Sequence, residues 1–401
     1  MLTDIDLTTI RDPLLHWFSH NARTLPWREN PSAYRVWVSE IMLQQTRVEA
    51  VKPYFERFIQ ALPDVAALAL CEEERLLKLW EGLGYYNRVR NMKEAAQTVM
   101  ECYDGVIPSD YETLCTLKGI GSYTAGAIAS IAYGRKVPAV DGNVLRIMTR
   151  LSADDTDIAK QPFKRQVEQA LLPVMPDDAG KFNQALMELG AIVCTPNGKP
   201  DCAHCPWESM CLAHRSHRET DFPVKAKKKE RTIEKKTVLL IKDGERVLIT
   251  KRPEKGLLAG LYEFPTMSGY VTKKQALKET ERLGLLPLRI EPLSDAKHVF
   301  THKEWHMKGY LIRVAGSEEC RFFTEPNSIE TNHMDVSHTE KNHTTNDDTE
   351  KNPIGTDFVK TVSTGTTCEK KEYLLAEKKE LEKTYPIPSA YAAYKEVAVQ
   401  G

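Results

Sequence analysis

Two apolar runs flank a single carboxylate, Glu40, in the N-terminal part of the chain. The runs cover residues 36–38 and 41–43. On a helix, apolar residues at this density occupy most of the circumference, so the pattern predicts a buried helix. Burial disfavours a charged carboxylate and raises its pKa, which suits a general acid working near neutral pH. The alternative is a structural carboxylate satisfied by an arginine such as Arg28.

The pattern stays helical up to about residue 220. Proline and glycine separate short amphipathic segments, and no strand-like alternation persists. We expect a first helix over about 8–22, a turn at 25–28, and breaks at Pro53 and Pro63. The first 220 residues therefore predict an all-α domain.

Residues 79–90 contain two glycines, two tyrosines and two arginines, which is unusual for a core element. Tyrosines offer stacking faces, and arginines offer phosphate partners. A capped loop with incidental aromatics is the alternative.

Residues 114–128 predict a helix, a Gly119-x-Gly121 turn and a second helix, with Lys118 beside the turn. Backbone N–H groups at such a turn suit a phosphate, although a plain helical hairpin has the same pattern.

Two further positions carry candidate chemistry. Asp141 follows the Gly-x-Gly turn by about twenty residues, and it could simply cap a helix that begins near Asn143. Cysteines in the spacing Cys194-x7-Cys202-x2-Cys205-x5-Cys211 predict a metal site within residues 194–211. Zinc is the default occupant of four cysteines, and an iron–sulfur cluster is the other option.

The composition changes at a basic linker over 221–236, and the pattern beyond it is strand-like. Residues 237–250 predict a β-hairpin, 273–283 a helix and 305–314 a strand. Residues 237–401 therefore predict a second, α+β domain. Within it, 325–370 is polar and almost free of aromatics, so we expect a disordered insertion whose histidines are solvated.

The length and net charge of the chain restrict its function less than the sequence patterns do. A chain of 401 residues predicts two or three domains, and its net charge of −1 provides no global basic field, so any nucleic-acid binding needs a local face. The sequence contains no apolar run of membrane-spanning length and no signal-peptide pattern at its N-terminus. We therefore expect a cytoplasmic protein, and in a reducing compartment clustered cysteines favour a metal over disulfides.

Taken together, the stretches 25–28, 37–47, 81–91, 117–125, 137–146, 182–195 and the four-cysteine loop resemble the helix-hairpin-helix DNA glycosylases of the endonuclease III superfamily. Within them they resemble the A/G-specific adenine DNA glycosylases (MutY-type). The resemblance implies an enzyme of base excision repair that flips adenine out of double-stranded DNA when it lies opposite 8-oxoguanine or guanine. It implies a monomeric, bacterial-type protein that acts on the nucleoid, has repair proteins as partners and does not associate with a membrane.

The resemblance also implies roles for individual residues. Glu40 would protonate the adenine, and Asp141 would stabilise the oxocarbenium-like sugar, with Asn143 and Tyr123 beside them. The four cysteines would hold a [4Fe–4S] cluster, although the first spacing is one residue longer than the family leads us to expect. The remaining positions would bind substrate (Trp27, Arg28, Leu43, Gln45, Thr46, Leu83, Tyr85 and Gln184) or DNA phosphate (Lys118, Gly119 and Gly121).

Bifunctional lyases of the same superfamily carry a lysine where this chain has Tyr123, so the resemblance implies a monofunctional enzyme. The C-terminal domain resembles a Nudix fold that lacks the glutamate-rich Nudix box, so we expect no pyrophosphatase activity. Its turn Phe300-Thr301-His302 would recognise 8-oxoguanine. Two alternatives stay open: a bifunctional glycosylase/lyase, and a non-catalytic iron–sulfur protein that binds DNA.

Overall fold

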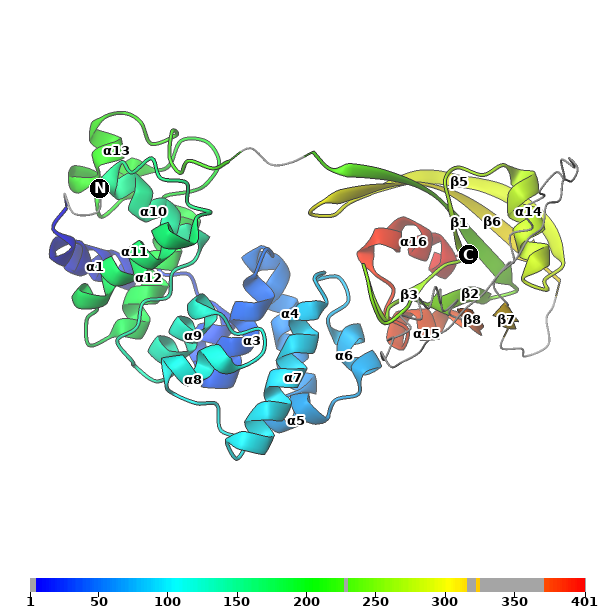
Figure 1. Ribbon diagram of the computed structural model, residues 1–401, viewed down its shortest axis with the longest axis horizontal. Coiled ribbons are helices and arrows are strands. Elements are labelled where there is room, and N and C mark those ends of the chain that lie inside the picture. The colour runs from blue at the N-terminus through cyan, green and yellow to red at the C-terminus, as the bar shows by residue number, and fades with distance from the viewer. Residues whose placement is uncertain (1–4, 227–229, 316–321, 325–370, 401) are drawn as a thin grey trace, which may run out of the picture.

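The computed structural model describes residues 5–226, 230–315, 322–324 and 371–400. The insertion expected over 325–370 lies outside these residues. Figure 1 shows a helical N-terminal part beside a C-terminal part built on a sheet. The expected succession of an all-α and an α+β domain is therefore confirmed. Among the described helices, none has both the length and the apolar character needed to span a lipid bilayer.

The N-terminal part consists of helices joined by short loops. The α-helices are α1 (Arg11–Asn21), α2 (Pro26–Glu29), α3 (Ala33–Leu43), α4 (Val48–Ala61), α5 (Val65–Leu70), α6 (Glu73–Leu79), α7 (Asn87–Cys102), α8 (Tyr111–Thr116), α9 (Ser122–Ala127), α10 (Gly142–Ser152), α11 (Gln161–Leu171), α12 (Ala179–Ile192) and α13 (Leu212–Arg215). They bury two separate hydrophobic cores. One lies among α3 to α7 around Trp37 and Trp80, and the other lies among α1, α10, α11 and α12 around Phe182.

Two local predictions in this part are wrong. Pro53 does not break the chain, because it lies inside α4. Val51, Phe55 and Phe58 of the same helix are buried in the first core, and this packing offsets the hydrogen bond that proline cannot donate. Residues 25–28 are not only a turn, since Pro26 begins the short helix α2 at a position where its missing N–H has no cost.

The C-terminal part is one mixed sheet with helices on both faces. Its elements are β1 (Thr232–Asp243), β2 (Arg246–Lys251), β3 (Tyr262–Glu263), β4 (Thr266–Ser268), α14 (Lys273–Arg282), β5 (Pro287–Val299), β6 (Lys303–Val314), β7 (Phe322–Thr324), β8 (Lys371–Ala376), α15 (Lys378–Lys383) and α16 (Ala392–Gln400). The strand order is β5-β6-β1-β2-β8-β7, with β1 and β6 parallel. The core that includes Tyr394 of α16 and the core that includes Ala276 of α14 contain alternate residues of β1, so the two helices cover opposite faces.

The hairpin expected over 237–250 is confirmed as the antiparallel pair β1–β2. The strand β5 was not predicted, and its burial explains why. None of its residues is fully buried, and the alternation of apolar and polar residues over 288–291 stops at Pro292, so no pattern of strand length marks it. The β5–β6 hairpin carries residues 300–302 in the turn between its strands.

Candidate active site

Glu40 lies on the last turns of α3, and only 5% of its surface is exposed. The side chain of Ser32 caps the start of α3, and the apolar residues on both sides of Glu40 are buried. Tyr123, near the start of α9, donates a hydrogen bond from its hydroxyl to Oε2 of Glu40. Burial raises the pKa of Glu40 to about 7, and it outweighs the opposing effect of the Tyr123 hydrogen bond. Glu40 can therefore carry a proton near neutral pH.

The alternative in which Arg28 neutralises Glu40 is wrong. Arg28 donates from Nη2 to Oε2 of Glu188 at 2.8 Å, and Arg23 pairs with the same carboxylate at 2.7 Å. Burial acts to raise the pKa of Glu188, but the hydrogen bonds from the two arginines outweigh it and lower the pKa to about 2. Two carboxyls thus line the same cavity, one that can hold a proton near neutral pH and one that is fixed as an anion.

Glu188 was not singled out from the sequence. Its ion pairs lead to a prediction about the stability of the protein. Replacing Glu188 by Gln leaves two arginines without a buried counter-charge, so we expect a loss of about 3–5 kcal/mol in the free energy of unfolding. Thermal unfolding of the parent protein and of the variant at neutral pH measures this loss. Since the folded pKa is depressed, the stabilisation is present above the ordinary pKa of 4.5 and disappears as the pH falls towards 2. Equal stability of the variant and the parent protein at neutral pH would contradict this account.

Asp141 is the N-cap of α10, as the capping alternative expected. Its Oδ1 accepts hydrogen bonds from the backbone N–H of Asn143 at 2.9 Å and of Val144 at 2.8 Å. Its other oxygen, Oδ2, accepts from the side-chain amide of Asn143 at 2.7 Å. Burial raises the pKa of Asp141, although these hydrogen bonds act in the opposite direction. The cap consequently holds the carboxylate in one orientation at the cavity wall, so capping does not exclude a chemical role.

A cavity of about 730 Å³ brings most of the expected site residues together. Its walls come from α2, α3, α9, α10 and α12, so it lies between the two cores of the helical part. The expected residues that line it are Trp27, Arg28, Glu40, Leu43, Gln45, Thr46, Tyr123, Asp141, Asn143 and Gln184. The cavity also contains residues that were not predicted, among them Arg23, Lys164, Met187 and Glu188. The volume is sufficient for a nucleobase with its sugar.

The other expected residues lie outside the cavity. Lys118, Gly119 and Gly121 form the turn before α9. Gly119 has a φ of +77°, and a Cβ on it would lie 2.7 Å from Cβ of Asn91, so only glycine fits this turn. Leu83, which the resemblance assigns to substrate binding, is buried in the helical core.

Tyr85 and the turn 300–302 meet at a second place. Tyr85 is half-exposed and has a φ of +48°, which is uncommon for a residue other than glycine. Its hydroxyl lies 2.9 Å from Oγ1 of Thr301, so a hydrogen bond joins the helical part to the β5–β6 turn. Phe300 packs its ring against Trp305, and Thr301 and His302 are exposed. The structure thus places two expected substrate-binding segments side by side.

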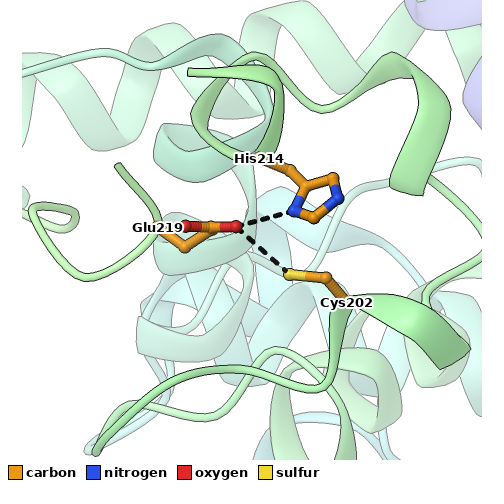
Figure 2. Close-up of side chains that lie close together, drawn as sticks. All are labelled: Cys202, His214 and Glu219. Atoms are coloured by element: carbon orange, nitrogen blue, oxygen red, sulfur yellow. Dashed lines mark hydrogen bonds and ion pairs between the residues drawn. The ribbon is translucent and has the colours of Figure 1, made fainter. Parts of the chain in front are cut away.

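The four clustered cysteines line one small cavity of about 30 Å³. The guanidinium of Arg150 donates to Sγ of Cys194 at 3.2 Å. Figure 2 shows Cys202 beside His214 and Glu219, whose side chains form a hydrogen bond of 2.6 Å. These three residues could also bind a metal ion, but Nδ1 of His214 and Oε1 of Glu219 are hydrogen-bonded to each other. The four sulfurs therefore form the more complete ligand set.

Comparisons with known proteins agree with this architecture. Residues 38–173 match the model of the HhH-GPD superfamily of base excision DNA repair proteins, and residues 237–336 match that of the NUDIX domain. The adenine DNA glycosylase of Mus musculus is 36% identical over 371 residues, which cover 77% of this chain and 71% of the relative.

The chain belongs to the adenine DNA glycosylase family. The member of this family from Buchnera aphidicola subsp. Acyrthosiphon pisum is 33% identical over 314 residues, which cover 78% of this chain and 88% of the relative. A solved thermostable thymine-DNA glycosylase is 25% identical with a TM-score of 0.47, over 52% of this chain and 96% of that one. As a member of the family, the chain is a DNA glycosylase of base excision repair, a hydrolase of N-glycosyl bonds.

Proposed function

We propose that this glycosylase hydrolyses the N-glycosidic bond of adenine that lies opposite 8-oxoguanine or guanine in double-stranded DNA. One observation carries the proposal: a buried carboxyl that can hold a proton near pH 7, Glu40, shares a cavity with the oriented carboxylate of Asp141. Cleavage of a glycosidic bond needs an acid for the leaving group and a negative charge for the sugar cation. The relatives' activity on adenine supports the choice of base.

In the proposed reaction the adenine is flipped into the cavity and Glu40 donates a proton to its five-membered ring. The protonated base leaves with the electrons of the glycosidic bond, and positive charge develops on the sugar. The carboxylate of Asp141 stabilises this charge, and Asn143 holds that carboxylate in place through its amide. Water then adds to the sugar, and its proton returns to a carboxylate. Tyr123 positions Glu40 throughout.

We propose that the enzyme is monofunctional. A lyase needs an amine that forms a Schiff base with the sugar, and Tyr123 occupies the place where the related lyases carry it. Lys164 lines the cavity, but its ammonium donates to Oγ of Ser122 at 2.8 Å. The test is borohydride trapping during turnover together with strand analysis before and after alkali. The proposal expects breaks only after alkali and little trapped complex, and efficient trapping would overturn it.

The rate of base release should fall as the pH rises through about 7, because Glu40 works in its protonated form. Single-turnover rates measured at saturating enzyme from about pH 5 to 9 locate the bend in the pH–rate profile. Replacing Tyr123 by Phe removes a hydrogen bond that lowers the pKa of Glu40, so the bend should move to higher pH. A flat profile, or a rate that rises through this range, would contradict the role of Glu40.

We further propose that the turn 300–302 and Tyr85 recognise 8-oxoguanine on the opposite strand. Two observations support this: the hydroxyls of Thr301 and Tyr85 lie within hydrogen-bond distance, and His302 is exposed next to them. The backbone N–H groups of the turn around Gly119 and Gly121, with Lys118 beside them, would hold a phosphate. Gln45 is exposed at the cavity wall with a φ of +60°, where it can probe the space that the flipped adenine leaves in the base stack.

We also propose that Cys194, Cys202, Cys205 and Cys211 hold a [4Fe–4S] cluster. Four thiolates around one small cavity, with Arg150 donating to one of them, fit such a group. When bound, the cluster would keep the loop folded against α10, and no step of base release passes through it. The cavity of the cysteines is separate from the one that contains Glu40.

Cys205 gives a direct test of the ligand set. Its replacement by Ala should abolish the visible absorbance of the purified protein, reduce its iron content from about four per chain, and lower its melting temperature. Cys102 is exposed on α7, away from the cluster loop, and its replacement by Ala is the matched control. Full iron content in the Cys205 variant would contradict the assignment.

A further inference from the structure

The segment from α6 to the start of α7 connects two features of the molecule. Residues 73–90 carry Tyr85, which contacts the β5–β6 turn. Among the described residues, they also provide most of the hydrogen bonds and ion pairs between the helical part and the C-terminal domain. Figure 1 shows α6 and α7 on the side of the helical part that faces the sheet domain. The contacts away from the turn are the subject of the inference.

Lys78 is the centre of these contacts, and only 13% of its side chain is exposed. Its ammonium donates to the backbone carbonyl of Leu381 at 2.9 Å and to that of Tyr385 at 3.1 Å, both in the C-terminal domain. It also forms an ion pair with Glu81 at 2.5 Å. Glu81 in turn accepts a hydrogen bond from Lys395 of α16. The half-buried Lys78 thus ties α15 and the loop after it to α6, and Glu81 adds a link to α16.

Contacts on either side extend this attachment. Glu74 accepts hydrogen bonds from the hydroxyl of Tyr262 at 2.6 Å and from Lys251 at 3.1 Å. Arg90 donates to the carbonyl of Ala259 at 2.6 Å. Leu261, fully buried, belongs to the hydrophobic core of α3 to α7 rather than to that of its own sheet. Directional hydrogen bonds and a shared core fix an orientation, whereas a flexible tether would permit many.

We propose that Lys78 and Glu81 are positioning residues that fix the C-terminal domain on α6. In this position the turn 300–302 contacts one base of a mispair while the Glu40 cavity binds the other. The inference rests on the proposed recognition of 8-oxoguanine by that turn. Neither residue lines the cavity, so neither acts on the adenine itself. Their effect is expected in the preference for 8-oxoguanine over guanine opposite adenine, and not in the chemical step.

The test compares adenine release from 8-oxoguanine:adenine and guanine:adenine duplexes, under subsaturating and saturating enzyme. Replacing Lys78 by Met keeps the apolar stem and removes the three donors. We expect the preference for 8-oxoguanine to fall roughly fivefold or more, with an unchanged saturated rate on guanine:adenine. Lys395→Met breaks the same link from the other domain and should do the same. The matched control is Lys136→Met, because Lys136 pairs with Asp177 on the surface of the helical part.

A double-mutant cycle separates positioning from a general loss of stability. The variant Thr301→Ala/His302→Ala removes the polar groups of the turn, and adding Lys78→Met to it should cause no further loss of preference. Small-angle scattering should show a wider spread of distances in Lys78→Met than in Lys136→Met. Additive losses, equal losses on both duplexes, or an unchanged preference in both Lys78→Met and Lys395→Met would overturn the positioning role. A turn variant that keeps the full preference would overturn recognition by the turn, and the positioning role with it.

Discussion

Replacing Glu40 by Gln should reduce the single-turnover rate of adenine release by a factor on the order of 10²–10⁴. The amide has nearly the same shape, and its oxygen can still accept the hydrogen bond from Tyr123. What it lacks is an acidic proton that can be donated to the base near pH 7, the property that burial gives to Glu40. Binding of the mispaired duplex should be nearly unchanged, because no phosphate is expected to contact a buried residue on α3.

The matched control for this variant is Glu49→Gln. Glu49 lies on the neighbouring helix α4, is exposed, and pairs with Lys52 three residues along the same helix. It does not line the cavity, so its replacement should leave base release unchanged. A Glu40→Gln protein that releases adenine at the parent rate would remove Glu40 from the reaction, and the cavity would then need a different acid.

Replacing Asp141 by Asn should slow adenine release by a factor on the order of 10²–10³. Asn is as good an N-cap as Asp, so α10 should keep its start and the protein its fold. The variant loses only the negative charge that would face the developing sugar cation. Its rate should therefore fall without a large change in melting temperature, whereas the capping alternative predicts that neither the rate nor the melting temperature changes.

Asp178→Asn provides the control, since Asp178 caps the neighbouring helix α12 in the same way but lies outside the cavity. The two substitutions make the same chemical change at equivalent helix positions. Equal rates in both variants would show that the charge of Asp141 serves α10 alone.

The sequence allowed the site to be predicted where one short segment contains the whole signal. The apolar runs around Glu40 indicated its burial, and burial is what raises its pKa. Glu188 stands in a similar run, 186–189, and was missed. The difference between a neutral acid and a paired anion depends on Arg23 and Arg28, which lie about 160 residues away and are bonded to Glu188 only in the fold.

The C-terminal domain shows the same limit. The hairpin β1–β2 could be predicted from two apolar runs on either side of the turn at 242–245, whereas β5 could not, because none of its residues is fully buried. The attachment of the two domains depends on Lys78, which sits in an ordinary amphipathic helix. Its role is visible only once the carbonyls of Leu381 and Tyr385 lie beside it, since hydrogen bonds between distant segments have no signature in a single sequence.

The most direct test of the account is single-turnover release of adenine from duplexes in which it lies opposite 8-oxoguanine, guanine or thymine. The protein should carry its cluster, and alkali added afterwards should reveal abasic sites. The account predicts release opposite 8-oxoguanine and guanine, none opposite thymine, and strand breaks only after alkali. Release opposite thymine at a similar rate, or no release from any of the three duplexes, would contradict it.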